Sequence, residues 1–420
     1  MFIRKYRRGS IKAFMQYVRW ISFPARKLTA SKQHHVFFLV TLTFLVSSGK
    51  CLSFSGGEPM EIILRTEVQV DLFFHCLAHM DIGQDASSLY SQAYMSRISR
   101  EKILNSRDPA WLTSEMDKIK DIYIPDQKLR MVNFLPFQFM NVEQLLEGLK
   151  WLSGDLQGNS PQPFLPFFRQ RYFSSPGAQS FLRTLTEILV VEYQTFYREF
   201  WKRQNGQRTA LKKRFRTLFE ESGLKLLGPA LKGKKGVIIY LCLSMTRNGR
   251  GFSSGDYFGA AVKFPEEENE IMRSFFFSIH EMTHLFLDEW TLRQSGYPDA
   301  PGSTRSGDEG YDIHLLKESA VLYADYLLCK KILPTFLTDY VLTFLELSGE
   351  GDRGNLARFL PTKLEKLFKA RISLTAKTGQ LLETFIWNLL NSRESVPDMQ
   401  KEKFGCQPMI PRNFPLTNLT

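Results

Sequence analysis

The stretch His280-Glu281-Met282-Thr283-His284 decides which fold and site to expect from this 420-residue chain. Two histidines four residues apart lie one above the other on the same face of an α-helix, so both imidazoles can reach one metal ion. Glu281 follows the first histidine directly, and its carboxylate would lie beside such an ion, where it can accept a proton from a bound water. The spacing therefore predicts a metal site with two histidine ligands and a base next to them.

The flanking residues predict a long buried helix. Pro265 is followed by four glutamates within five residues, which is typical of a helix start, where a fixed φ angle and negative charge are favourable. From Ile271 to Trp290 the apolar residues fall on every side, as in a helix inside a large domain. Two histidines and a carboxylate are costly to bury there unless a metal ion or hydrogen bonds satisfy them.

A catalytic zinc needs a third protein ligand and an open fourth position. The next helical pattern runs from Asp312 to Ile332 and contains Glu318. Its neighbours Ser319 and Ala320 are small and would allow close packing on the first helix. His314, one turn before Glu318 on the same face, is an alternative ligand or a donor to the transition state.

At these residues the sequence resembles the gluzincins, zinc peptidases with two helical histidines and a glutamate from a following helix. The run HEMTHLFLDEWT, residues 280 to 291, is similar to the thermolysin-type helix, including Asp288 four places after the second histidine. The resemblance covers roughly residues 236 to 330. It implies a zincin-like domain that binds one zinc ion, Zn2+, per chain, with Glu281 as general base and three ligands, His280, His284 and Glu318.

The chain departs from the thermolysin-type pattern around the third ligand. That pattern has Asn just before the glutamate and Asp four places after it, whereas this chain has Lys317 and Leu322 there. Asp325 lies seven residues beyond Glu318, about two turns on and on the same face. It could orient a ligand histidine in place of the missing aspartate. The extended metzincin pattern is absent.

Two short runs before the helix predict strands. Gly236 to Ser244 and Tyr257 to Phe264 are rich in β-branched and aromatic residues, and Asn248 to Gly251 predicts a turn between them. In zincins an edge strand beside the active-site helix pairs with the extended substrate. The second run would let a peptide approach at three small residues, Gly259, Ala260 and Ala261. The alternative is an ordinary hairpin.

Ser295 to Tyr311 is rich in Gly, Ser, Pro and Asp and has no hydrophobic period, so we expect a loop over the cleft. Peptide hydrolysis develops negative charge on the carbonyl oxygen, which a donor can stabilise. The candidate donors are Arg305, Tyr311 and Tyr323. Each of them, taken alone, is better explained as a surface or packing residue.

The first fifty residues predict export. They contain ten Lys and Arg and no acidic residue, and Val36 to Val46 is a run of apolar residues and threonines before small residues. This order is typical of a secretory signal peptide, and the run is shorter than the roughly 20 residues of a spanning helix. We expect a periplasmic or extracellular protein, cleaved between Ser48 and Leu52 or held at the membrane by its uncleaved N-terminal segment.

Charge indicates the class of partner. The whole chain carries +12, but the residues beyond position 50 include 45 basic and 43 acidic ones, so no electrostatic case for nucleic acid remains. The expected partner is a peptide or protein substrate. The five cysteines are scattered and allow no pairing to be named. His75 and His79, also four apart, lack a base and a third ligand, which disfavours a second metal site.

The predicted organisation has four parts: the leader 1–50, a helical N-terminal domain 51–230, a zincin-like domain 231–394 and a tail 395–420. About 370 residues beyond the leader exceed one compact core. The expected fold class is α+β and predominantly helical, with a small sheet. The expected function is zinc-dependent peptide hydrolysis; the alternatives are a zinc-binding scaffold without turnover and a zinc hydrolase of a non-peptide amide or ester.

Overall fold

The computed structural model describes residues 60–80, 92–231, 233–245, 249–295, 307–345, 361–370 and 372–391. These residues belong to one compact unit that begins at Met60. The predicted leader and tail, and residues 296–306 of the predicted loop, lie outside them. None of the described helices is long and apolar enough to cross a membrane. The predicted division of the chain at residue 230 stays a prediction.

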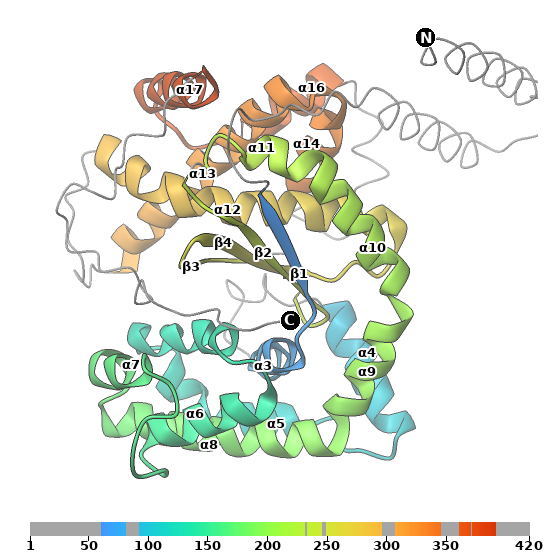
Figure 1. The fold of residues 1–420 in the computed structure, drawn as a ribbon, viewed down its shortest axis with the longest axis vertical. Coiled ribbons are helices and arrows are strands. Elements are labelled where there is room, and N and C mark those ends of the chain that lie inside the picture. The colour runs from blue at the N-terminus through green and yellow to red at the C-terminus, as the bar shows by residue number, and fades with distance from the viewer. Residues whose placement is uncertain are drawn as a thin grey trace, which may run out of the picture. The chain divides into compact units, whose positions relative to one another are not determined.

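The fold is predominantly helical with one small mixed sheet, as the predicted α+β class requires (Figure 1). The sheet has the strand order β1-β2-β4-β3, from β1 (Glu61–Arg65), β2 (Gly236–Cys242), β4 (Tyr257–Lys263) and β3 (Arg250–Ser254). β1 and β4 run parallel to β2, whereas β3 runs antiparallel to β4. The two predicted strands are therefore the two central ones, buried along almost their whole length.

Two sequence-based interpretations of the sheet were wrong. Tyr257 to Phe264 was expected to offer a free edge to a peptide, but β4 lies between β2 and β3. Its Gly259 is needed because an added Cβ would lie 2.2 Å from the ring of Phe252. Among the described residues, the strand on that side of the sheet whose outer edge is unpaired is β3, part of which was predicted to be a turn. β1 was also missed, since it comes from the region that we expected to be helical.

Both long helices of the site were predicted, but the second begins at Gly307, so the end of the predicted loop, residues 307–311, is helical instead. α12 (Ile271–Gln294) starts after the acidic segment and packs on β3 and β4. α13 (Gly307–Ile332) packs along α12 on the side away from the sheet (Figure 1). On the opposite face of the sheet, Phe137 of the 3₁₀ segment η2 (Gln127–Gln138) stacks on Phe252 with ring centroids 4.5 Å apart. The sheet is thus buried on both faces, which explains its nearly continuous apolar strands.

Helices make up the remainder. Before β2 the short ones are α3 (Val68–Ala78), α4 (Gln92–Leu104), α5 (Trp111–Tyr123), α6 (Val142–Ser153) and α7 (Leu165–Tyr172). The last part of the predicted helical region is a succession of helical segments, two of them π-helical: α8 (Pro176–Glu192), η3 (Tyr193–Tyr197), α9 (Arg198–Gln207), α10 (Thr209–Leu218), η4 (Phe219–Gly223) and α11 (Leu224–Leu227). Near and after the long helices come η5 (Glu268–Glu270), η6 (Pro334–Phe336), α14 (Leu337–Leu345), α16 (Pro361–Lys369) and α17 (Ala376–Asn391).

The second histidine pair has a structural explanation. His75 on α3 is buried, with Nδ1 2.8 Å from the Tyr94 hydroxyl and Nε2 2.9 Å from Glu192. Lys102 donates to the same Glu192 carboxylate at 3.0 Å. Nδ1 of His79 lies 3.1 Å from the Thr113 hydroxyl. Lys102 pairs with the Glu192 carboxylate, which disfavours a metal ion there, so these histidines belong to a buried polar cluster.

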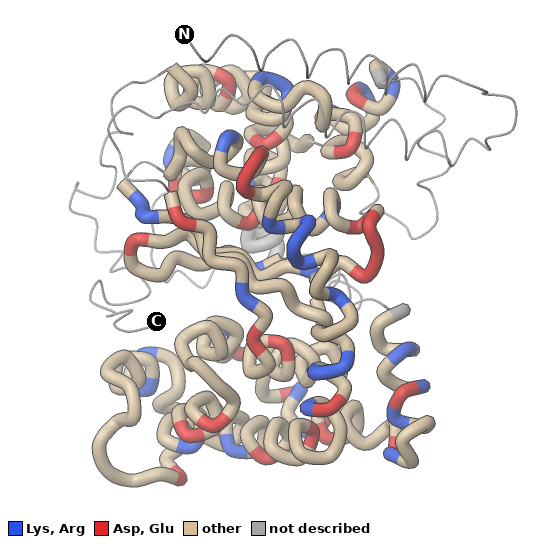
Figure 2. The backbone as a smooth tube through the Cα atoms, turned by 45° about the vertical axis from the view of Figure 1, so that its right-hand side comes forward, with Lys and Arg blue, Asp and Glu red and all other residues tan. Residues whose placement is uncertain are grey.

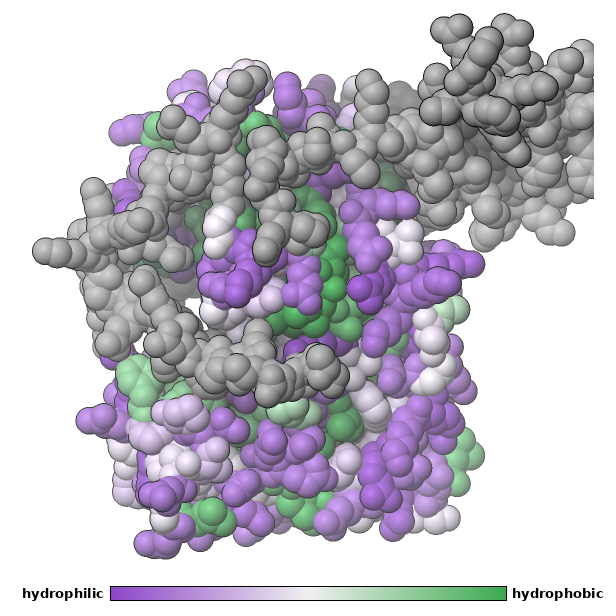
Figure 3. All heavy atoms as spheres, in the orientation of Figure 1, coloured by the Kyte–Doolittle hydropathy of each residue, from purple (hydrophilic) through white to green (hydrophobic). Residues whose placement is uncertain are grey.

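Charged residues are well mixed over the described chain. Lys and Arg alternate with Asp and Glu along the tube in Figure 2. Hydrophilic side chains cover most of the described surface on the face in Figure 3, with hydrophobic residues showing mainly near its middle. This distribution agrees with the near balance of basic and acidic residues beyond position 50.

Candidate metal centre

Helix α12 brings the two motif histidines together. His280 and His284 lie one turn apart, with ring centroids 4.8 Å apart and planes at 90°. Their Nε2 atoms are 3.2 Å from each other. His280 is almost fully buried, whereas 16% of the His284 side chain is exposed. Solvent can therefore reach the group past His284 but not past His280.

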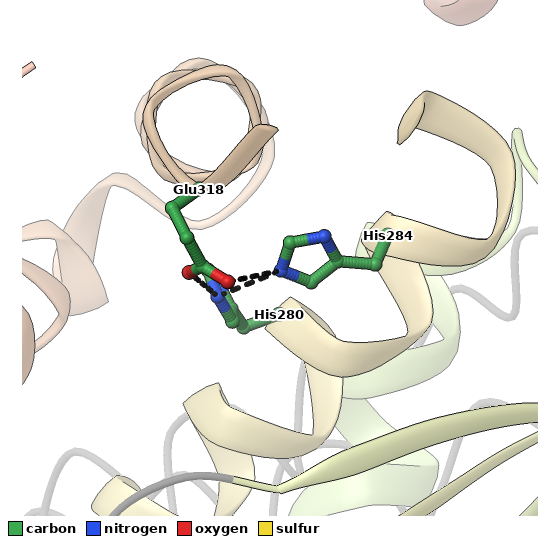
Figure 4. A group of neighbouring side chains, drawn as sticks. All are labelled: His280, His284 and Glu318. Atoms are coloured by element: carbon green, nitrogen blue, oxygen red, sulfur yellow. Dashed lines mark hydrogen bonds and ion pairs between the residues drawn. The ribbon is translucent and has the colours of Figure 1, made fainter. Parts of the chain in front are cut away.

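Helix α13 adds Glu318, whose carboxylate faces both imidazoles (Figure 4). One oxygen, Oε2, lies 3.2 Å from Nε2 of His280, and the other, Oε1, lies 3.4 Å from Nε2 of His284. One ligand atom from each of these three residues lies within 4.8 Å of the other two. Within the described ranges this is the one group of three or more such residues that could hold a metal ion.

Two aspartates occupy the far side of the rings. Asp288 Oδ1 forms a hydrogen bond with Nδ1 of His284 at 2.7 Å, whereas Asp325 Oδ2 lies at ion-pair distance, 3.3 Å, from Nδ1 of His280 without a hydrogen bond between them. A carboxylate at Nδ1 favours the proton on that nitrogen and leaves the lone pair on Nε2. Both Nε2 atoms face Glu318 and would present their lone pairs to a bound metal ion. Of the predicted supporting residues, these two lie next to the ligand histidines.

Each aspartate is itself held in place. The hydroxyl of Thr283, inside the motif, donates to Asp325 Oδ1 at 2.6 Å. Lys317 Nζ lies 3.4 Å from Asp288 Oδ2. From the sequence, Lys317 was only a departure from the thermolysin-type pattern, and the contact of Thr283 with Asp325 was not predicted. Thr283 lies four residues after Ile279, and this place on the buried face of the helix was the one sequence signal that its hydroxyl would need a partner.

The charges of the group shift its titration. Burial lowers the pKa of His280, but the carboxylates of Asp325 and Glu318 outweigh it and raise the pKa to about 9. Burial acts on His284 in the same way, and Asp288 and Glu318 raise its pKa to about 11. Burial raises the pKa of Glu318, yet the two histidines outweigh it and hold that pKa far below the usual range. The two histidines are thus favoured in their protonated, positively charged form next to the ionised carboxylate of Glu318.

The donor set and its spacing fit a small tetrahedral cation. Zinc bonds of about 2.0–2.2 Å to nitrogen and oxygen place neighbouring ligand atoms of a tetrahedron about 3.4 Å apart. The two Nε2 atoms are 3.2 Å apart, and each has a different oxygen of Glu318 next to it, Oε2 at 3.2 Å from His280 and Oε1 at 3.4 Å from His284. Two imidazoles and a carboxylate are also an ordinary set for a catalytic zinc.

Glu281 is separate from this group and is fixed by the sheet. Its Oε1 accepts the backbone N–H of Gly249 at 3.0 Å, and its Oε2 accepts that of Gly251 at 2.9 Å. These donors lie at the start of the edge strand β3. The carboxylate thus contacts neither ligand histidine through a hydrogen bond or ion pair among those found in the described residues, as expected for a base that is not a ligand.

The other predicted residues lie farther from the centre. His314 has an exposed side chain, and its Nδ1 is 3.8 Å from Glu318 Oε1. The Tyr323 hydroxyl donates to Glu383 of α17. Tyr311 belongs to α13, but its side chain and all of Arg305 lie outside the described residues. The structure therefore brings His314 near the group and directs Tyr323 to another helix.

Comparison of the chain with models of protein families, with curated proteins and with solved structures finds no match.

Proposed function

We propose that this chain is a zinc-dependent metallopeptidase in which His280, His284 and Glu318 bind one zinc ion. The observation that carries the proposal is that one ligand atom from each of the three residues lies within 4.8 Å of the other two, together with an aspartate near Nδ1 of each histidine. Such outer carboxylates orient imidazoles for metal binding and increase their basicity. An ion-pair cluster without a metal ion would not require both imidazole rings to turn Nε2 toward Glu318.

The chemistry follows from the types of residue present. A zinc ion in this position would polarise the carbonyl of a substrate and lower the pKa of a water molecule. Glu281 is the residue that would accept the proton of that water and pass it to the leaving amine. Its two oxygens each keep a lone pair after accepting one backbone N–H, so the carboxylate is anchored and still able to bind a proton.

The edge strand supports a peptide as the substrate class. Within the described residues β3 pairs only with β4, so its other edge is open next to α12. In zincins such an edge strand pairs with the extended substrate backbone, and β-augmentation supplies affinity through main-chain hydrogen bonds. This proposal moves the substrate strand from β4, as the sequence suggested, to β3.

The experiment compares wild type with Glu281→Gln and His284→Ala on a peptide library, with zinc content measured in parallel. We expect wild type to cleave peptides, a chelator to abolish cleavage, and zinc to restore it. Glu281→Gln should keep its zinc and lose at least ~10²-fold in rate, the lower end of general-base contributions. His284→Ala should lose its zinc.

Two outcomes would contradict the proposal. If Glu281→Gln cleaves as fast as wild type, the activity comes from another site. If zinc-loaded wild type cleaves nothing in a broad library, a zinc-binding scaffold, or a hydrolase of non-peptide amides, explains the centre better.

A further inference from the structure

The edge strand β3 packs on α12, and the backbone at its start is hydrogen-bonded to the proposed base, Glu281. Gly249 and Gly251 donate their backbone N–H groups to the two carboxylate oxygens of Glu281, at 3.0 and 2.9 Å. Hydrogen bonds to an ionised acceptor are about twice as strong as neutral ones. Two of them from one strand restrict both the position and the rotation of the carboxylate.

Both donors must be glycines for this contact to form. A Cβ on Gly249 would lie 2.5 Å from Glu281 Cγ and 2.8 Å from the Ala261 carbonyl oxygen. A Cβ on Gly251 would lie 2.3 Å from the carbonyl oxygen of Glu281. These separations are far below van der Waals contact, so any side chain would push the strand and the helix apart.

We propose that Gly249 and Gly251 are positioning residues, whose backbone amides clamp the carboxylate of Glu281. Helix α12 alone leaves a glutamate several rotamers. The clamp selects one rotamer and so fixes the base before substrate binds. Less conformational entropy of the side chain is then lost on binding. This inference rests on the proposed function for the role of the base, whereas the clamp itself is independent of catalysis.

Glutamine at position 281 tests the clamp without any substrate. It has nearly the same shape as glutamate, but its NH₂ group would face one of the two N–H donors, so one donor loses its acceptor. We expect the Tm of Glu281→Gln, measured in chelator, to fall by several degrees, on the order of 2–10 °C. Glu289→Gln is the matched control, because Glu289 lies on the same helix with 57% of its side chain exposed.

Amide hydrogen exchange gives a second measurement on the same proteins. The N–H groups of Gly249 and Gly251 should exchange slowly in wild type and in Glu289→Gln, and faster in Glu281→Gln. Equal Tm values and equal exchange rates for the two glutamine variants would overturn the clamp, whatever the activity of wild type.

The positioning role is tested by kinetics with Gly249→Ala, whose new Cβ would displace the Glu281 side chain. We expect full zinc content and a kcat at least tenfold lower, with a change in KM smaller than the change in kcat, because β3 is also the proposed substrate strand. Gly206→Ala is the control, since an added Cβ there meets nothing within 4 Å. A Gly249→Ala enzyme with normal kcat would overturn the role. If the clamp is present but wild type hydrolyses no peptide, the proposed function fails and the contact is structural only.

Discussion

The carboxylate of Asp325 lies 3.3 Å from Nδ1 of His280 and reaches this ring from two turns beyond Glu318 on α13. The same helix therefore carries both Glu318, a proposed metal ligand, and the carboxylate that lies next to Nδ1 of His280, a second proposed ligand. In the thermolysin-type pattern the corresponding aspartate comes four residues after the glutamate, where this chain has Leu322. Position 325 lies almost two full turns beyond Glu318 and so on the same face of α13, which carries Asp325 toward His280.

Loss of the Asp325 carboxylate should weaken metal binding. In Asp325→Ala nothing holds Nδ1 of His280, and outer partners of metal-binding histidines typically contribute 10–100-fold in affinity, so we expect a loss of about that size. Competition with a chromogenic chelator measures it. The control is Asp155→Ala, since Asp155 pairs with Arg183 at the surface, outside the group. Equal zinc affinities of the two variants would contradict the assigned role of Asp325.

The identity of the third ligand is decided by two substitutions on α13. Glu318→Ala should lose zinc, because two histidines alone rarely hold it tightly. His314→Ala should keep zinc, since its ring is exposed and lies outside the group. Zinc content after extensive dialysis gives the answer. Retention in Glu318→Ala together with loss in His314→Ala would assign the ligand to His314.

The buried cluster around Glu192 predicts a large effect on stability. Lys102 is 2% exposed and donates to Glu192, so Glu192→Gln would leave a buried cation without a counter-charge. Breaking such a pair typically costs about 3–5 kcal/mol in the free energy of unfolding. Glu199→Gln, at a site with 69% of its side chain exposed, should change it by less than about 0.5 kcal/mol. Similar denaturation midpoints for both variants would refute this account.

The same cluster predicts loss of stability in acid. Burial lowers the pKa of His75 despite the opposing effect of Glu192. Below a pH of about 6.5, the pKa of a histidine in the unfolded chain, the unfolded state therefore binds more protons than the folded state. Burial raises the pKa of Glu192, but His75 and Lys102 outweigh it, and the net pKa is lowered. Its stabilisation is thus present above about pH 4.5 and lost as the pH falls further. Both groups act in the same direction.

Urea unfolding at pH 7, 6 and 5 measures this effect. The free energy of unfolding of wild type should fall more steeply toward pH 5 than that of His75→Gln, which cannot titrate. The difference between the two proteins isolates His75 from the histidines of the metal centre. A difference that is independent of pH would contradict the lowered pKa.

The local parts of the site could be predicted from sequence. The spacing of His280 and His284 fixes their relation on any helix, and the apolar residues around them place that helix in the core. Glu318 followed from a second helical pattern at a plausible distance along the chain. These inferences need no knowledge of how distant segments pair.

The order of the strands could not be predicted in this way, because strand pairing is non-local. β1 pairs with β2 across more than half of the described chain, and nothing in Glu61–Arg65 indicates its partner. Small residues in β4 looked suited to a peptide, yet Gly259 accommodates the ring of Phe252. The glycines that allow close approach to α12 were instead Gly249 and Gly251, in a segment that resembled a turn.

Anomalous diffraction at the zinc edge, from crystals of the zinc-loaded protein, tests the central claim most directly. We predict one strong peak within about 2.0–2.2 Å of Nε2 of His280, Nε2 of His284 and a carboxylate oxygen of Glu318. Zinc bound in stoichiometric amount at other residues, with no peak among these three, would contradict the account.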